Sequence, residues 1–161
     1  VYFETIKNKT ASLLASACGA GAWSASGDEA MVEKMKAFGE KVGIAFQIKD
    51  DTFDFGTDDV GKPLGIDIKE KKVTLPLIYA LNRADRSEKK RIINLVKNHQ
   101  DDPKKIAEII DFVNAKEGVH YANQKMLEYQ QEAFDILYTF EAGEARTGLE
   151  QLVRYTTERK K

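Results

Sequence analysis

The sequence predicts an all-α fold, a bundle of long antiparallel helices. Apolar residues recur at helical spacing almost throughout the 161 residues, and no alternating strand pattern is evident. Prolines, which interrupt helices, occur only at positions 63, 76 and 103. Hydrophobic residues make up 42% of the chain, and charged residues make up 32%. This composition supplies one domain core and gives most helices a solvated face.

The helices are expected in the following order. The first carries an apolar stripe of Ile6, Thr10, Leu13, Leu14 and Ala17 and ends near residues 24–27. Asp28 is the candidate N-cap of the second helix, whose apolar positions continue to Phe53. A glycine-rich irregular stretch then covers residues 56–72. Later helices are expected at residues 74–83, 88–98 with Ser87 as N-cap, 104–114 after Asp102-Pro103, 116–139 and 144–159.

Composition also excludes several classes of protein. The net charge of −1 argues against a nucleic-acid partner and against a polybasic membrane anchor. Cys18 is the only cysteine, so an intrachain disulfide is impossible. The longest apolar stretch, residues 11–23, is too short for a transmembrane segment, and the first residues are no signal peptide. We therefore expect a soluble, cytoplasmic protein, whose numbering begins inside a longer natural chain because the first residue is not Met.

Four polar residues of the second helix share one helical face, at offsets i, i+3, i+4 and i+7: Gln47, Asp50, Asp51 and Asp54. Repulsion between Asp50 and Asp54 alone costs about 0.2–0.5 kcal/mol. Mg²⁺ would relieve it, since this ion prefers carboxylate oxygens and completes its shell with water and substrate phosphates. A solvated acidic face is the alternative. A calcium loop is rejected because its twelfth position holds Gly61, where a bidentate Glu is needed.

The surrounding residues add a family resemblance. Residues 46–54, Phe-Gln-Ile-Lys-Asp-Asp-Thr-Phe-Asp, resemble the second aspartate-rich motif of the trans-isoprenyl diphosphate synthases. Residues 61–67 and 72–77 follow in order and resemble the Gly-Lys-Pro-x-Gly-x-Asp and Lys-x-Thr-Leu-Pro elements of that family. Upstream, Lys9-Thr10 is similar to the Lys-Thr pair that faces the allylic diphosphate. The helices after residue 85 resemble the family only in general character.

The resemblance implies a fold and a place within it. Residues 1–161 are expected to form the C-terminal part of a single isoprenoid-synthase domain, of the medium- or long-chain, octaprenyl type. The first Asp-Asp-x-x-Asp motif of a complete enzyme is absent, as are the basic residues expected upstream of it. The fragment alone is therefore expected to be inactive. Faces that would pack against the missing half are expected to be bare, and the candidates are the apolar stripe of residues 6–17 and the Met35–Phe38–Val42–Phe46 stripe.

The resemblance also implies roles for individual residues. The metal is Mg²⁺, with Asp50 and Asp54 as its expected ligands and Asp51 as a further ligand or a support behind them. The expected catalytic residues are Lys9, Thr10, Gln47 and Lys62, and the same four bind the substrate diphosphate together with Lys72. Lys71 competes with Lys72 for this last role, because Glu70-Lys71-Lys72 stands where the family has Gly before its motif lysine.

The implied reaction condenses an allylic prenyl diphosphate with isopentenyl diphosphate, and the implied assembly is a homodimer. The alternative is a non-catalytic helical subunit of a heteromeric polyprenyl synthase. The intact aspartates favour the enzyme over this subunit. A plain helical scaffold would leave the acidic stripe without an explanation.

Overall fold

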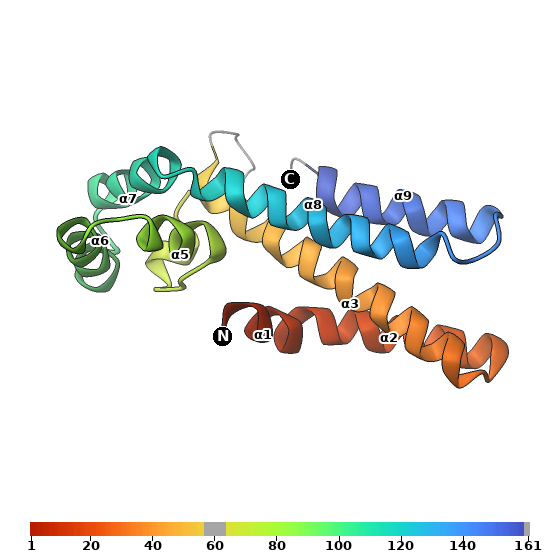
Figure 1. Ribbon diagram of the computed structural model, residues 1–161. Helices are drawn as coiled ribbons and strands as arrows, with labels where there is room; N and C mark the ends of the chain where they lie inside the picture. Colours follow the sequence, from red (N-terminus) through yellow and green to blue (C-terminus); the bar gives the residue numbers. More distant parts are fainter. Residues whose placement is uncertain (57–63, 160–161) are drawn as a thin grey trace. The chain divides into compact units, whose positions relative to one another are not determined.

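The structure is a computed structural model that describes residues 1–56 and 64–159, in which every regular element is a helix (Figure 1). The all-α prediction is therefore confirmed for the described residues. In chain order the elements are α1 (Tyr2–Ile6), the π turn η1 (Lys7–Ala11), α2 (Ser12–Ser26), α3 (Glu29–Thr52), the 3-10 turn η2 (Phe53–Phe55), α4 (Ile66–Lys69), α5 (Leu75–Asn82), α6 (Arg86–Asn98), α7 (Pro103–Ala115), α8 (Gly118–Leu137) and α9 (Glu144–Glu158).

The chain divides into two compact units. The first unit comprises Val1–Lys49 and Lys125–Arg159, and the second comprises Asp50–Gln124. The first unit holds α1, η1, α2, most of α3, most of α8 and α9. The second holds η2 and α4–α7. The candidate site residues are distributed over both units, so each set is described within its own unit.

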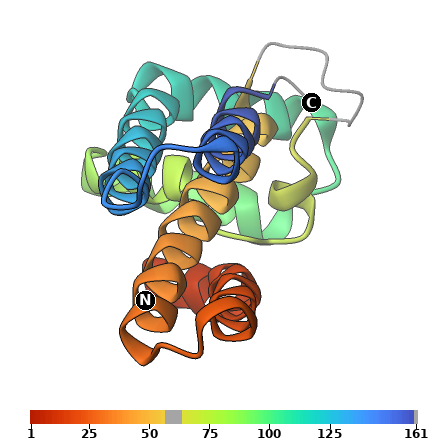
Figure 2. The same ribbon diagram turned by 90° about the vertical axis from the view of Figure 1, so that its right-hand side faces the viewer.

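A hydrophobic cluster of the first unit is built mainly by three helices, α3, α8 and α9. The buried residues of this cluster are Phe38, Val42, Ala133, Phe134, Leu137 and Val153. Phe38 is 3% exposed and Val42 is 4% exposed. The prediction that the Met35–Phe46 stripe would be bare is therefore wrong, because α8 and α9 already cover it. Figure 2 shows α2 lying alongside α3 on another side of that helix.

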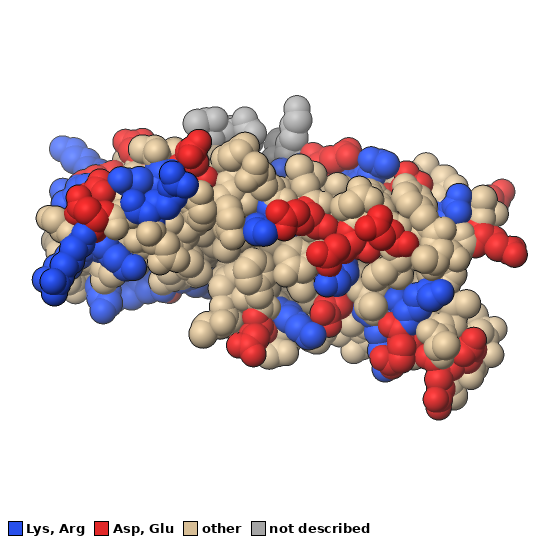
Figure 3. All heavy atoms as spheres, viewed as in Figure 1, with Lys and Arg blue, Asp and Glu red and all other residues tan. Residues whose placement is uncertain are grey.

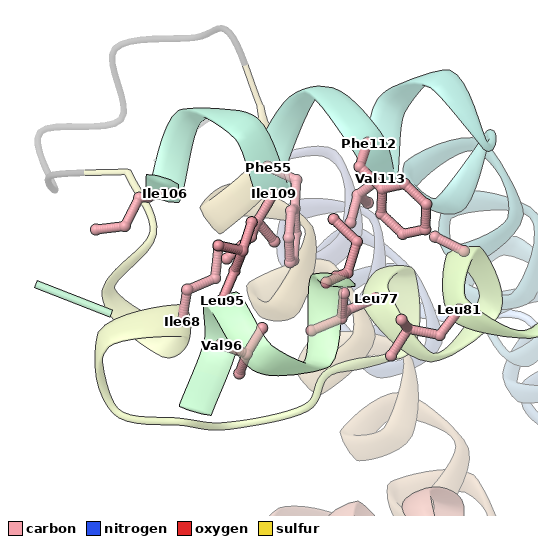
Figure 4. Packing of buried hydrophobic residues seen from close by; sticks show 12 residues of the cluster. Phe55, Ile68, Leu77, Leu81, Leu95, Val96, Ile106, Ile109, Phe112 and Val113 are labelled. Atoms are coloured by element: carbon pink, nitrogen blue, oxygen red, sulfur yellow. The ribbon is translucent and has the colours of Figure 1, made fainter. Parts of the chain in front are cut away.

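The core of the second unit lies among α4, α5, α6, α7 and η2 (Figure 4). Phe55 of η2 and Ile68 of α4 are among its most deeply buried side chains, at 1% and 0% exposure. These two residues lie on either side of the segment that the structure does not describe. The backbone that carries Asp54, and the backbone just before Lys72, are therefore both anchored in one hydrophobic core.

The first helix departs from the prediction because it contains a π turn. Ile6 and Ala11 are both buried, at 5% and 0% exposure, although they stand five residues apart. A π turn closes hydrogen bonds over five residues instead of four, so inward positions after it move by one. Leu13, predicted to lie on the apolar stripe, is 72% exposed. The predicted stripe is therefore wrong at Leu13 and Ala17, which are exposed, whereas Thr10 is half-buried and Leu14 packs against the hydrophobic cluster of the first unit.

The helix caps agree with the prediction at two positions and correct it at a third. The N–H of Ala30 donates to Asp28 Oδ1 at 2.9 Å, and the side chain of Asp102 accepts from the N–H of Lys104. The N-cap of α6 is Asp85 instead of Ser87. Asp85 accepts two backbone N–H groups, while Glu88 reaches back to its N–H, which makes a complete capping box.

The described surface carries mixed charge. On the face seen in Figure 3, basic side chains predominate at the left-hand end, where α6 lies, and acidic and basic side chains are interspersed elsewhere. None of the helices in the described residues is both long enough and apolar enough to span a bilayer.

Candidate functional site

The predicted site residues fall into two sets. Lys9 and Thr10 lie in η1, and Gln47 lies in α3; these three belong to the first unit. The second set belongs to the second unit and contains Asp50 and Asp51 at the end of α3, Asp54 in η2 and Lys72 after α4. Lys62, the remaining predicted residue, lies outside the described residues.

The first set contains a hydrogen bond between two motif elements that are far apart in sequence. The hydroxyl of Thr10 donates to Gln47 Oε1 at 2.7 Å, across 37 residues of chain. The neighbouring Lys9 is exposed. Both Lys9 and Thr10 lie in the π turn, a local structure that occurs frequently at functional sites. The sequence indicated the residues here, but periodicity gave no sign of the π turn.

The second set begins on α3. Asp51 is buried, with 5% of its surface exposed, and Asp50 is half-buried. Asp54 lies in the 3-10 turn that follows the helix. The prediction that all four polar residues share one α-helical face therefore holds for Gln47, Asp50 and Asp51 but is wrong for Asp54. The buried side chain of Phe55 draws the chain into the core immediately after it.

Asp54 is engaged by the backbone at the start of α4. The N–H of Asp67 donates to Asp54 Oδ2 at 2.5 Å. Burial raises the pKa of Asp54 to about 6, although the N–H of Asp67 acts in the opposite direction. The carboxylate of Asp67 adds a smaller increase. Asp54 therefore holds the position of Asp67, a residue whose own role was not predicted although it closes the Gly-Lys-Pro-x-Gly-x-Asp element.

Lys72 is paired with two carboxylates. Its Nζ lies 3.2 Å from Asp67 Oδ1 and also contacts Glu70. The bond to Glu70, followed by the bond to Asp67, raises the pKa of the Lys72 ammonium. Lys72 is therefore a protonated cation tied to the same Asp67 that Asp54 contacts.

Lys71 occupies the position where the resemblance expects glycine. Its φ is +56°, in the left-handed region that favours glycine. The Lys71 N–H donates to the Ile68 carbonyl at 3.0 Å, and the Lys72 N–H donates to the Asp67 carbonyl at 2.8 Å. These two bonds form a Schellman motif with Lys71 at its left-handed C′ position. The backbone thus keeps the glycine conformation at Lys71, which supports Lys72 as the motif lysine.

The described carboxylates do not form a closed metal cage. Within residues 1–56 and 64–159, no three His, Cys, Asp or Glu side chains are grouped so that they could hold a metal ion. Mg²⁺ is commonly held by one or two carboxylates while substrate phosphates and water complete its octahedron. In the structure Asp50 is half-buried, Asp51 is buried and Asp54 accepts the N–H of Asp67 at the start of α4.

Comparison with known proteins gives relatives of one kind. The chain is 34% identical over 160 residues to a short chain isoprenyl diphosphate synthase from Methanothermobacter thermautotrophicus, covering 98% of this chain and 49% of that protein. It is 32% identical over 161 residues to heptaprenyl diphosphate synthase component 2 from Bacillus subtilis, covering 99% of this chain and 45% of that protein. The chain therefore spans about half the length of these relatives.

Solved structures that are similar to this chain are also prenyl diphosphate synthases. Geranylgeranyl pyrophosphate synthase from Bacteroides thetaiotaomicron matches with a TM-score of 0.89 at 37% identity, over 98% of this chain and 52% of that one. A polyprenyl synthase from Caulobacter crescentus, complexed with calcium and isoprenyl diphosphate, matches with a TM-score of 0.88 at 30% identity, over 99% of this chain and 49% of that one. The polyprenyl synthetase family model matches residues 1–113, well over half of the chain, and the chain belongs to that family.

Proposed function

We propose that this chain supplies the diphosphate-binding half of a trans-polyprenyl diphosphate synthase. The enzyme would join an allylic prenyl diphosphate to isopentenyl diphosphate. The observation that carries the proposal is the 2.7 Å hydrogen bond between Thr10 and Gln47, which joins two of the ordered motif elements. The Caulobacter crescentus relative, whose structure contains calcium and isoprenyl diphosphate, supports a cation and a diphosphate as ligands.

The proposed chemistry requires positive charge near a leaving diphosphate. As the allylic C–O bond breaks, its electron pair goes to the diphosphate, and lysines stabilise the developing charge. Lys9, Lys62 and Lys72 are the proposed cations, Thr10 supplies a hydroxyl to the same diphosphate, and Gln47 is proposed to lie near the reacting end of the substrate. Mg²⁺, when bound through Asp50 and Asp51, supplies further charge neutralisation to the diphosphate oxygens.

The remaining steps need no further group from the protein. The double bond of isopentenyl diphosphate attacks the allylic cation and forms the new C–C bond. The resulting cation loses a proton, which the released diphosphate accepts. Asp54 takes a supporting part in this scheme, because its carboxylate holds the N–H of Asp67.

The test is the binding of inorganic diphosphate by calorimetry, with and without Mg²⁺. We expect Mg²⁺ to raise the affinity at least about tenfold, or about 1.4 kcal/mol. Asp50→Asn is expected to abolish this gain, because it removes a ligand charge with little change in shape. Asp111→Asn, on the exposed surface of α7 in the same unit, is the matched control and should retain the gain. A diphosphate affinity indifferent to both Mg²⁺ and Asp50→Asn would contradict the proposal.

A second candidate function is a subunit of a heteromeric synthase. Two relatives, from Bacillus subtilis and Geobacillus stearothermophilus, are named component 2 of heptaprenyl diphosphate synthase. We expect no condensation by this chain alone and turnover when a chain carrying the first aspartate-rich motif is added. Asp50→Asn separates the two functions. It should abolish turnover of the mixture if this chain is catalytic, and it should leave turnover intact if this chain is a non-catalytic subunit.

A further inference from the structure

Two glycines of α3 lie so close to the preceding helix that they leave no room for a side chain. A Cβ on Gly43 would lie 2.5 Å from Ala11 Cα and 2.8 Å from Ala11 Cβ. A Cβ on Gly39 would lie 2.5 Å from the Leu14 carbonyl oxygen. By contrast, a Cβ on Gly21 would meet nothing within 4 Å. Gly39 and Gly43 therefore lie on the side of α3 that faces η1 and α2, which lie beside it in Figure 2, and Gly21 of α2 is a glycine position with open space around it.

Gln47 continues the same face of α3. Gly39, Gly43 and Gln47 are separated by intervals of four residues, so their Cα atoms lie on one side of the helix. The hydroxyl that reaches Gln47 belongs to Thr10, the neighbour of Ala11. A threonine hydroxyl is carried directly on Cβ and has little reach. Its bond to Gln47 therefore depends on how closely the two backbones approach.

The effect of adding one methyl group can be worked out from these distances. Two carbon atoms pack at about 3.5 Å, so a Cβ that lies 2.5 Å from Ala11 Cα would displace η1 by about 1 Å. The same displacement would lengthen the 2.7 Å bond between Thr10 and Gln47 to about 3.7 Å. A contact of that length is no longer a hydrogen bond.

We infer that Gly39 and Gly43 are positioning residues, which hold η1 against α3 so that Thr10 contacts Gln47. The consequence for catalysis rests on the proposed function, in which Thr10 contacts the diphosphate and Gln47 lies near the reacting end of the substrate. The contact itself is a property of the folded chain and requires no substrate. The glycines therefore act through Thr10 and Gln47. An experiment can separate the effect of the glycines from the effect of the hydrogen-bonded pair.

The test is a double-mutant cycle on the unfolding equilibrium of the whole chain. Thr10→Val and Gln47→Leu remove the two partners, singly and together, and the cycle isolates their coupling. We expect a coupling of about fivefold in the unfolding equilibrium constant, the size of one net hydrogen bond. In the Gly43→Ala background the coupling should fall to about onefold, because the bond is broken. In the Gly21→Ala background it should remain at about fivefold.

Two results would overturn the inference: coupling that survives Gly43→Ala, or coupling that is absent from the parent chain. If Gly43→Ala does not fold, Ala11→Ser replaces it, because this change adds one atom at a position of 0% exposure facing Gly43. The coupling should then fall below half, and full coupling would again refute the inference. Because no substrate is present, a chain that fails to bind diphosphate would defeat the proposed function and leave this result unaffected.

Discussion

Replacing Lys71 by glycine is expected to stabilise the chain. Lys71 is a lysine at a φ of +56°, at the C′ position of the Schellman motif that ends α4. A residue with a Cβ costs about 1–2 kcal/mol in this left-handed conformation. Glycine avoids that cost but loses about 0.5–1 kcal/mol more backbone freedom on folding. The difference predicts that Lys71→Gly raises the free energy of unfolding by about 0.5–1 kcal/mol.

Urea unfolding followed by far-UV circular dichroism measures this change. A gain of that size shifts the midpoint upward by about 0.25–0.5 M at an m-value near 2 kcal/mol/M. Lys69→Gly is the matched control. It removes the same charge two residues earlier, at the last residue of α4, where the backbone is helical and glycine should destabilise by about 0.5–1 kcal/mol. Two results would refute the argument from backbone conformation. One is a loss of stability in both variants, and the other is an equal free energy of unfolding for Lys71→Gly and Lys69→Gly.

Two further predictions concern the second unit. Backbone N–H groups of Glu88 and Ser87 lower the pKa of Asp85, and the side chain of Lys116 is the main cause of a lowered pKa at Glu88. Both carboxylates thus add stability that is present above their ordinary pKa values and is lost as the pH falls through the lowered ones. Asp85→Ala should therefore be less stable than the parent at pH 7 and converge with it in acid, as measured by urea midpoints across pH. Ile109 is a core residue of 0% exposure. Ile109→Ala should lower the free energy of unfolding by about 2–5 kcal/mol in the same assay, because the substitution leaves a cavity in the core.

Helix boundaries were predictable where a cap stands directly before an apolar pattern. Asp28 and Asp102 were identified in this way, and both accept the expected backbone N–H groups. The cap of α6 was placed at Ser87 although a stronger signal stood two residues earlier. Asp85 is followed three residues later by Glu88, the spacing of a capping box, whereas Ser87 is followed by Lys90. The residue types at these positions therefore suffice to place the N-cap at Asp85.

The π turn could not be predicted from residue spacing. A stripe of Ile6, Thr10, Leu13 and Leu14 is a normal helical pattern, and nothing in those residue types marks an extra residue in the turn. The π turn is seen in the backbone hydrogen bonding of residues 7–11, and it accommodates the burial of both Ile6 and Ala11. Contacts with α3, which formed no part of the sequence pattern, select which residues of η1 point inward. The same contacts bring Thr10 to Gln47.

The candidate site shows a similar division between residue type and residue role. The spacing and the family resemblance both identify the aspartates, but the spacing alone does not distinguish the role of one aspartate from that of another. The structure separates Asp54 from Asp50, because η2 turns Asp54 toward the Asp67 N–H. Asp67 in turn contacts Lys72, so these three residues form a connected chain of polar contacts within the second unit. A change at Asp54 should therefore affect Lys72 through Asp67, even where Asp54 binds no metal itself.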